Sequence, residues 1–117
     1  MSKKVLGINF GRVNGNCKTF LNTAMEAAKA AGAEVEIIDV MKLEIKPCIG
    51  CGACSRILQS GKGQIRCCQK DDFEALSDAV LAADAMIVAA PVYVLAPTGQ
   101  MKNFIDRFGP AHDKAYM

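Results

Sequence analysis

Three short apolar segments alternate along this chain with stretches of helical periodicity, and this alternation restricts the fold more than any other feature. The apolar segments occupy residues 5–8, 35–40 and 85–90, and each is long enough for one buried strand. Between and after them, apolar side chains recur at spacings of three and four residues, the period of an amphipathic helix. A strand–helix unit repeated three times predicts an α/β fold with a parallel sheet and right-handed crossovers, in one small domain.

Turn and cap residues mark the ends of the expected helices. The first helix has an apolar face that begins at Phe20, and Gly32 supplies its end. One of the two aspartates at 71–72 is the expected N-cap of the second helix, and residues 97–99 and 109–110 bracket the last one. Ligands of parallel sheets bind beyond the carboxyl ends of the strands, so the loops after the first and third strands are the expected binding loops.

Cysteines are concentrated in one part of the chain, between the second strand and the second helix. Cys48, Cys51 and Cys54 are separated by two residues each, and Cys67 and Cys68 follow a loop rich in glycine and lysine. Three thiolates at this spacing with a distant fourth can converge on one inorganic centre, which favours an iron–sulfur cluster. Zinc is the first alternative, because Cys-x2-Cys pairs also bind it, and reduced thiols without metal are the second.

Composition and charge restrict the partners and the location. The formal net charge is only +2, the basic residues are interspersed with acidic ones, and the chain has no Trp. A nucleic-acid surface would require a clustered basic face, so no nucleic-acid partner is expected. No segment approaches the roughly 18 apolar residues that cross a bilayer, and no signal peptide opens the chain. We therefore expect a cytoplasmic protein without membrane contact, in which structural disulfides are rare.

The two expected binding loops differ in chemistry. The loop at 9–16 is rich in turn formers, and Arg12, Asn14 and Asn16 with the following helix N-terminus favour an anion such as phosphate. The loop at 90–99 is apolar and holds an aromatic side chain beside two prolines, a composition that can lie against a flat heterocycle. The alternatives are an ordinary turn for the first loop and a cover over the protein's own core for the second.

Three motifs occur in order along nearly the whole chain: residues 11–17, residues 47–54 followed by Cys67, and residues 90–93 running on to 100–107. Together they resemble the flavodoxin-like NADPH-dependent FMN reductase family, and the cysteine run is similar to that of its iron–sulfur flavoprotein branch. The resemblance implies a flavodoxin-like three-layer fold with a parallel sheet, bound FMN and a 4Fe-4S cluster. It further implies an FMN-dependent oxidoreductase that passes electrons between flavin and cluster, with NAD(P)H or a redox partner protein as the other party.

The resemblance also implies roles for individual residues by their positions in the motifs, although it names no catalytic residue. Around the FMN phosphate it places Arg12, Asn14, Asn16 and Cys17. Around the isoalloxazine ring it places Pro91, Val92, Tyr93, Thr98 and Gly99. As ligands of the cluster it implies Cys48, Cys51, Cys54 and Cys67.

The chain departs from the family pattern in both sites. Phe10 and Cys17 stand where relatives carry hydroxyl side chains, so two donors to the phosphate are missing. The gap from Cys54 to Cys67 is longer than usual, and Cys68 is an alternative to Cys67 as the fourth ligand. Two further functions therefore stay open: a cluster-free NAD(P)H-dependent FMN or quinone reductase, and a non-catalytic metal-binding relative.

The length of the chain predicts an incomplete sheet. A five-stranded flavodoxin-like sheet needs two more strands after Arg107, whereas only residues 108–117 follow. Residues 1–117 are therefore expected to form a single partial domain, truncated after the third strand–helix unit, with a cysteine-rich loop at 46–70. The third strand would then lie at the edge of the sheet with unpaired backbone groups, and we expect the chain to form a homo-oligomer that covers this edge.

Overall fold

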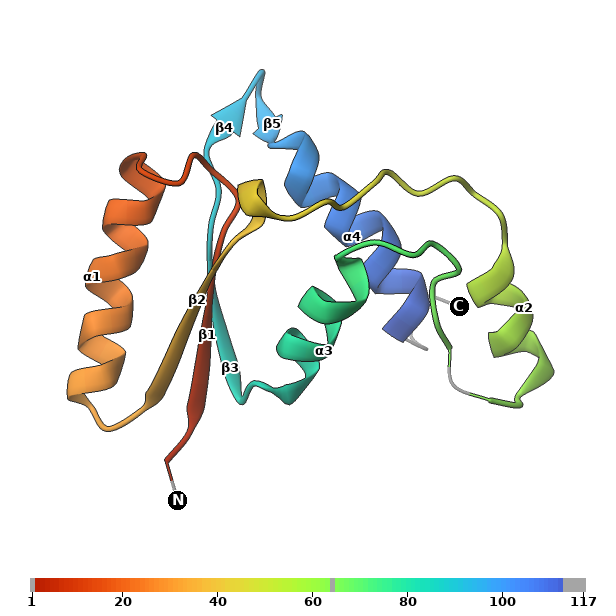
Figure 1. Ribbon diagram of the computed structural model, residues 1–117, viewed down its shortest axis with the longest axis horizontal. Helices are drawn as coiled ribbons and strands as arrows, with labels where there is room; N and C mark the ends of the chain where they lie inside the picture. Colours follow the sequence, from red (N-terminus) through yellow and green to blue (C-terminus); the bar gives the residue numbers. More distant parts are fainter. Residues whose placement is uncertain (1, 64, 113–117) are drawn as a thin grey trace.

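A parallel three-stranded sheet lies at the centre of the molecule (Figure 1). The computed structural model describes residues 2–63 and 65–112. The strands β1 (Lys4–Asn9), β2 (Glu34–Asp39) and β3 (Ala85–Ala89) pair in the order β2-β1-β3. Their register sets Asn9 opposite Asp39 on one side and opposite Ala89 on the other, so all three strands end at one level. The loops that follow β1 and β3 therefore leave the sheet side by side, as the predicted topology requires.

Helices cover both faces of this sheet (Figure 1). α1 (Asn16–Ala30) packs on one face, and α3 (Phe73–Ala82) and α4 (Gly99–His112) lie on the other. This helix–sheet–helix order confirms the predicted three-layer α/β class. The chain passes from β1 to β2 through α1 and reaches β3 through α3, because strands that run parallel in one sheet need a crossover connection.

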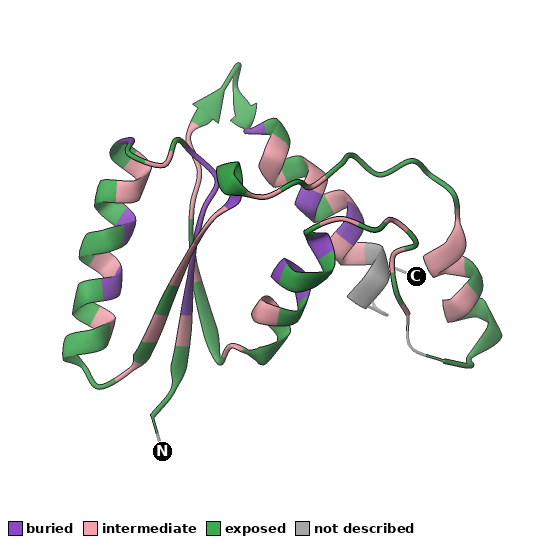
Figure 2. Cartoon of the chain, in the orientation of Figure 1, coloured by how far each residue is buried: buried purple, intermediate pink, exposed green. Residues whose placement is uncertain are grey.

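The alternation of side chains along β1 explains the two helix layers. Leu6 and Ile8 are buried in a cluster with Phe73 and Phe104, on the side of α3 and α4. Gly7 points the other way, and a Cβ atom there would come within 3.0 Å of the Met25 sulfur of α1. A residue without a side chain thus lets α1 approach the sheet closely. Figure 2 shows the buried residues along β1 and on the helix faces turned toward it.

Some boundaries differ from the predicted ones. The first helix ends at Ala30, and Gly32 follows at φ +100°, as expected, but Phe20 is 73% exposed and does not belong to the buried face. The last helix does not end at residues 109–110 but continues to His112, because a proline removes one N–H donor without preventing helical dihedrals at the residues after it. The side chain of His112 lies outside the described part of the chain.

The segment at 46–70, predicted as a loop, contains the helix α2 (Ala53–Ser60). Gly52 and Gly61 flank it with φ of +75° and +66°, conformations that suit glycine at helix ends. The apolar residues Ile57 and Leu58 follow Cys54 at helical spacing, which is the sequence signal for this helix. α2 contacts α4, so the cysteine segment packs on the helix side opposite α1 (Figure 1).

An apolar groove of about 250 Å³ runs between β3 and α4. Met86 and Val88 of β3 and Ile105 of α4 border it and are at least one third exposed. Within the described residues β3 pairs only with β1, so its other edge carries backbone groups without strand partners. No helix in the described ranges is both long and apolar enough to cross a bilayer.

Candidate functional site

Asn9, at the end of β1, organises the loop that follows it. Its Nδ2 donates hydrogen bonds to Asp39 Oδ1 at 2.9 Å and to the carbonyl of Arg12 at 3.1 Å, and its Oδ1 accepts the N–H of Gly11 at 3.0 Å. Lys18 of α1 completes the arrangement with an ion pair to Asp39 at 2.7 Å. Burial would raise the pKa of Asp39, but the hydrogen bonds from Lys18 and Asn9 outweigh it and lower the pKa below its usual value. Asn9 and the Lys18–Asp39 ion pair therefore hold the first turn of this loop in place.

The start of α1 offers donors for an anion. Gly15 is the N-cap and supplies no side-chain hydrogen bond, so the first N–H groups of the helix lack a side-chain cap. Arg12, Asn14 and Asn16 are exposed around this end, and Cys17 is half-buried in the first turn. The positive end of the helix dipole adds to the Arg12 charge, so the four residues predicted at the phosphate lie around one positively polarised helix terminus.

The loop after β3 lies directly against the loop after β1. A Cβ atom on Gly11 would come within 3.2 Å of Pro91 Cδ and within 3.5 Å of Cys17 Cβ, which shows how closely the two loops approach. Thr98 joins them to α4, because its fully buried hydroxyl donates to the carbonyl of Phe10 at 3.3 Å and accepts the N–H of Met101 at 3.2 Å. The Thr98 hydroxyl thus bonds to the protein's own backbone, and the side chain is buried rather than exposed at the carboxyl ends of the strands.

A two-stranded hairpin, which the sequence did not predict, occupies the middle of the second loop. It consists of β4 (Val92–Tyr93) and β5 (Ala96–Pro97), and it projects beyond the carboxyl ends of the sheet (Figure 1). At its tip Val94 and Leu95 have φ of +48° and +66°, and they are 95% and 97% exposed. Positive φ at such residues costs of the order of 1–3 kcal/mol each, a strain typical of functional loops. Both residues of β4, Val92 and Tyr93, are exposed. Gly99, the first residue of α4, is exposed as well.

The chain on either side of the cysteine segment, residues 44–46 and residues 71–72, is joined by hydrogen bonds. The N–H of Asp72 donates to the carbonyl of Glu44 at 3.0 Å, and the N–H of Glu44 donates to Asp72 Oδ2 at 2.7 Å. The N–H of Lys46 donates to Asp71 Oδ2 at 2.9 Å. The two aspartates at 71–72 therefore close the segment before its first cysteine. Asp71 Oδ1 also accepts the N–H of Phe73 at the start of α3 at 3.1 Å, whereas Asp72, the N-cap residue, makes no side-chain cap bond.

Arg107 of α4 bonds to residues at both ends of the cysteine segment, and its side chain is completely buried. Its Nη1 and Nη2 donate to both carboxylate oxygens of Asp71 at 2.8 and 2.9 Å, and Nη1 also donates to the carbonyl of Lys46 at 3.0 Å. Its Nε donates to Cys67 Sγ at 3.4 Å, and the guanidinium lies 4.4 Å from the centre of the Phe73 ring. One side chain thus joins α4, both ends of the cysteine segment and one of its thiols.

The charges of this pair are strongly stabilised. Burial alone would raise the pKa of Asp71, but hydrogen bonds from Arg107 and from two backbone N–H groups lower it to about 2. Burial would lower the pKa of Arg107, whereas the contacts with Asp71 and Cys67 raise it. No role for Arg107 was predicted from the sequence. The sequence does contain a signal for it: Arg107 lies three residues after Phe104, beside the apolar face of its helix. A charged side chain buried at such a position needs a partner of opposite charge.

The five cysteines of the segment are free thiols in different surroundings. The sulfurs of Cys51 and Cys68 lie 3.2 Å apart, whereas Cys67 is half-buried against Arg107. Cys48 is exposed and accepts the N–H of a nearby glycine, and Cys54 lies in the first turn of α2. Within the described ranges, no group of three or more Cys, His, Asp or Glu side chains converges where it could hold a metal ion. The structure therefore brings together one pair of cysteines and not the predicted set of four.

The thiols of that close pair have opposite pKa shifts. A backbone N–H at Ala53 lowers the pKa of Cys51, with Cys68 as a second donor and the guanidinium of Arg56 nearby. The pKa of Cys68 is raised, first by its hydrogen bond with Cys51. Cys51 is thus the better nucleophile of the two, because the thiolate is the reactive form.

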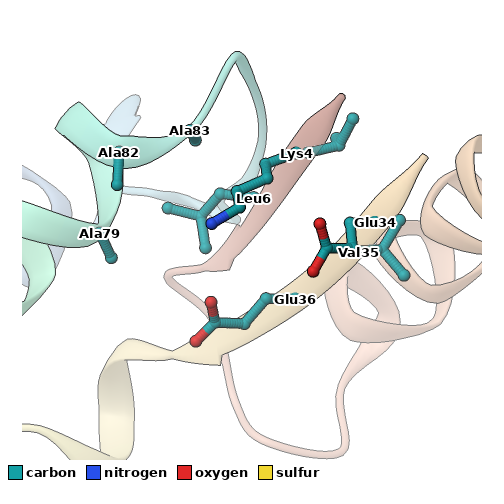
Figure 3. A pocket seen from close by; sticks show the side chains of 9 residues that line it. Lys4, Leu6, Glu34, Val35, Glu36, Ala79, Ala82 and Ala83 are labelled. Atoms are coloured by element: carbon teal, nitrogen blue, oxygen red, sulfur yellow. The ribbon is translucent and has the colours of Figure 1, made fainter. Parts of the chain in front are cut away.

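A second groove lies at the opposite end of the sheet from the binding loops (Figure 3). Its volume is about 250 Å³, and it is lined by the first residues of β1 and β2 and by alanines at the end of α3. Lys4, Glu34 and Glu36 supply its charges. Because it lies at the amino ends of the strands, it does not belong to the site predicted at their carboxyl ends.

Comparisons with known proteins connect this geometry to a family. The model of the family described as NADPH-dependent FMN reductase matches residues 4–117. The chain belongs to this family. An iron–sulfur flavoprotein of Archaeoglobus fulgidus is 40% identical over 99 residues, which are 85% of this chain and 42% of that protein. An iron–sulfur flavoprotein of Methanosarcina thermophila is 35% identical over 105 residues, 89% of this chain and 51% of that one. The predicted membership of the reductase family and of its iron–sulfur flavoprotein branch is therefore confirmed.

Solved structures of this reductase family's fold show the same architecture. A flavone reductase superposes with a TM-score of 0.74 at 31% identity, covering 97% of this chain and 32% of its own. An NAD(P)H:quinone oxidoreductase from Methanothermobacter marburgensis superposes with a TM-score of 0.70 at 16% identity, covering 95% of this chain and 55% of its own, which supports the fold alone. These neighbours confirm the flavodoxin-like α/β class. The chain spans about half the length of the curated relatives it matches.

Proposed function

We propose that this chain is the FMN-binding part of an oxidoreductase that passes electrons between the flavin and a cysteine-bound 4Fe-4S cluster. NAD(P)H or a redox protein would be the partner. The observation that carries the proposal is the contact of the loops after β1 and β3, marked by the approach of Gly11 to Pro91, beside a helix terminus that lacks a side-chain cap. Membership of the NADPH-dependent FMN reductase family and the names of the iron–sulfur relatives support it.

The donors present fit FMN. Bound flavin would supply exchange of two electrons or of one, and the protein would supply position and electrostatics. Arg12, Asn14 and Asn16 and the first N–H groups of α1 would hold the phosphate, with Cys17 packed beside it. Pro91 and the exposed strand β4, with Tyr93, would lie against the ring. Thr98 would act indirectly in this arrangement, by fixing the loop through its bond to the Phe10 carbonyl.

The cysteine segment has soft sulfur donors of the kind that iron–sulfur clusters require. We assign Cys48, Cys51, Cys54 and Cys67 as the ligands. Gly50 and Gly52, at φ of +66° and +75°, provide tight bends between the first three of them. The N–H of Arg107 would hold the Cys67 sulfur in position, and such donors also raise the potential of a cluster by stabilising its reduced form.

FMN titration tests the flavin half of the proposal. Replacing Arg12 by alanine removes a charged donor from an exposed loop, so the dissociation constant of FMN should rise about tenfold or more. Lys29→Ala is the matched control, because it removes the same charge from the last turn of the same helix, and it should leave the affinity unchanged. Equal affinity in the Arg12 variant and the parent would remove Arg12 from the site.

An absorption spectrum with iron and sulfide analysis of protein purified without oxygen tests the cluster half. Flavin bands with a broad brown shoulder and bound iron are the expected result. Flavin bands alone would favour a cluster-free NAD(P)H-dependent FMN or quinone reductase, a function for which one observation speaks: the described cysteines do not converge as a metal-binding group. Metal without flavin would indicate a non-catalytic metal-binding relative.

A further inference from the structure

Cys68 has no role in the proposed cluster, yet it makes the closest sulfur contact in the described segment. Its Sγ lies 3.2 Å from Cys51 Sγ, although the two residues are 17 positions apart. Both side chains are exposed, so small reagents can reach them. Cys51 is at the same time one of the four proposed ligands. A partner so close to a ligand thiol competes with metal for it.

We infer that Cys51 and Cys68 form a reversible disulfide that withholds Cys51 from the cluster. The pairing itself depends only on the geometry, whereas its effect on the cluster rests on the proposed function. The cysteine segment would then exist in two forms, one closed by the disulfide and one able to bind iron, and the redox state of the surrounding thiol pool would select between them.

Both partners are held in place by other groups, so their proximity is a property of the fold. Nη1 of Arg56 donates to the carbonyl of Cys51 at 3.1 Å, which ties the backbone of Cys51 to the first turn of α2. Cys68 follows Cys67, whose sulfur accepts the N–H of the buried Arg107. A disulfide bond is about 2.0 Å long, so closing the remaining gap requires a change of little more than 1 Å, which side-chain rotation can supply.

The chemistry balances with a low-molecular-weight disulfide, such as oxidised glutathione, as the oxidant. The thiolate of Cys51, next to the Arg56 guanidinium and the start of α2, attacks one sulfur of the oxidant, forms a mixed disulfide and releases one thiolate. The thiolate of Cys68 then attacks the Cys51 sulfur, the mixed disulfide breaks, and the second thiolate leaves. Two protein thiols are oxidised, one external disulfide becomes two thiols, and the same exchange runs backward with excess thiol.

Peptide mapping tests the pairing in metal-free protein. Trypsin cuts after Lys42, Arg56, Arg66 and Lys70 but not before Pro47, so Cys51 falls in peptide 43–56 and Cys68 in peptide 67–70. After exposure to oxidised glutathione, mass spectrometry should find these two peptides linked, and dithiothreitol should separate them.

Serine variants identify the sulfurs, because peptide 67–70 also contains Cys67 and peptide 43–56 also contains Cys48 and Cys54. The linked peptides should persist in Cys67→Ser and disappear in both Cys68→Ser and Cys51→Ser. Their survival in either of the last two variants, or the absence of any link in the parent, would overturn the inference.

Iron binding tests the consequence. Reduced parent protein should take up iron and sulfide under anaerobic reconstitution. Parent treated first with oxidised glutathione should take up neither until thiol is added. Reduced Cys68→Ser should load as the reduced parent does, whereas after oxidised glutathione it should carry bound glutathione on Cys51, because the mixed disulfide has no Cys68 thiolate to resolve it. If the reduced parent binds no iron, the proposed cluster fails, but the disulfide is still judged by the peptide map. If reduced Cys68→Ser alone fails to load, Cys68 is a cluster ligand and the inference is wrong.

Discussion

Replacing Arg107 by methionine is expected to lower the free energy of unfolding by about 3–5 kcal/mol, the cost of leaving one member of a buried ion pair without the other. The exposed fractions of the Arg107 and Asp71 side chains are 0% and 1%, so water cannot replace the lost guanidinium. Methionine retains part of the volume but none of the donors to Asp71 or to the Lys46 carbonyl. A domain of this size has only about 5–15 kcal/mol in total, so the loss is a large part of it.

A double-mutant cycle with Asp71→Asn separates the ion pair from simple packing. Asparagine carries no charge, so the double variant leaves no ion buried alone. Its loss should be smaller than the sum of the two single losses by about 1–3 kcal/mol. Lys102→Met is the matched control, because Lys102 is in an exposed pair with Asp106 on the same helix, and it should cost less than about 1 kcal/mol.

The measurement is urea unfolding at neutral pH, followed by far-ultraviolet circular dichroism, at the same protein concentration for all variants. The slope of the unfolding transition must stay the same for the comparison to hold. A loss below about 1 kcal/mol for Arg107→Met, or strict additivity in the double variant, would refute the role assigned to the buried pair.

Three further expectations concern acid, the core and the sheet edge. The pKa of Asp71 is lowered to about 2 in the folded state, so the ionised carboxylate stabilises the folded protein by about 2 kcal/mol. This stabilisation is complete above pH 4 and is lost as the pH falls from about 4 to 2. Unfolding curves at stepped pH should show the loss in the parent and not in Asp71→Asn. Phe10→Ser should destabilise the protein by about 3–5 kcal/mol in urea unfolding rather than simply restore a phosphate donor, since Phe10 is buried and its ring lies 6.1 Å from that of Phe104; an unchanged midpoint would contradict this. Among the described residues the outer edge of β3 has no strand partner, and this edge with its apolar groove should make the chain self-associate. Light scattering that finds a stable monomer of 12.5 kDa at high micromolar concentration would argue against it.

The fold class and the meeting of the loops after β1 and β3 could be predicted from local patterns. The predicted strand at 85–90 matches β3 to within one residue, because a short apolar run is typical of a strand. Its burial is less than predicted, since Met86 and Val88 of β3 are exposed. Gly32 ended the first helix as expected, since its φ of +100° suits a residue without a side chain. The parallel topology then placed the loops after β1 and β3 at one edge, where Gly11 and Pro91 meet.

Local patterns failed where a residue's role depends on a distant partner. Phe10 was considered only as a missing hydroxyl donor, yet its ring packs in the core against Phe104. The hairpin tip at Val94 and Leu95 adopts positive φ, which the intrinsic preferences of these residues oppose. The burial of Phe10 is set by its contact with Phe104, far along the chain. The positive φ angles belong to the two-residue turn between β4 and β5, which residues of these types do not signal.

The sequence alone determined the order of strands and helices and the presence of a sulfur-rich segment, and it predicted an anion site in the first loop, since each depends on residue type and spacing. Only the tertiary structure decided that Arg107 bonds Asp71 across 36 positions and that Cys51 meets Cys68 rather than Cys54. Such pairs form because the packing of α2 on α4, and of α4 over the sheet, brings together side chains that are far apart along the chain. The buried Arg107 and Asp71 also require polar partners, because water cannot reach them.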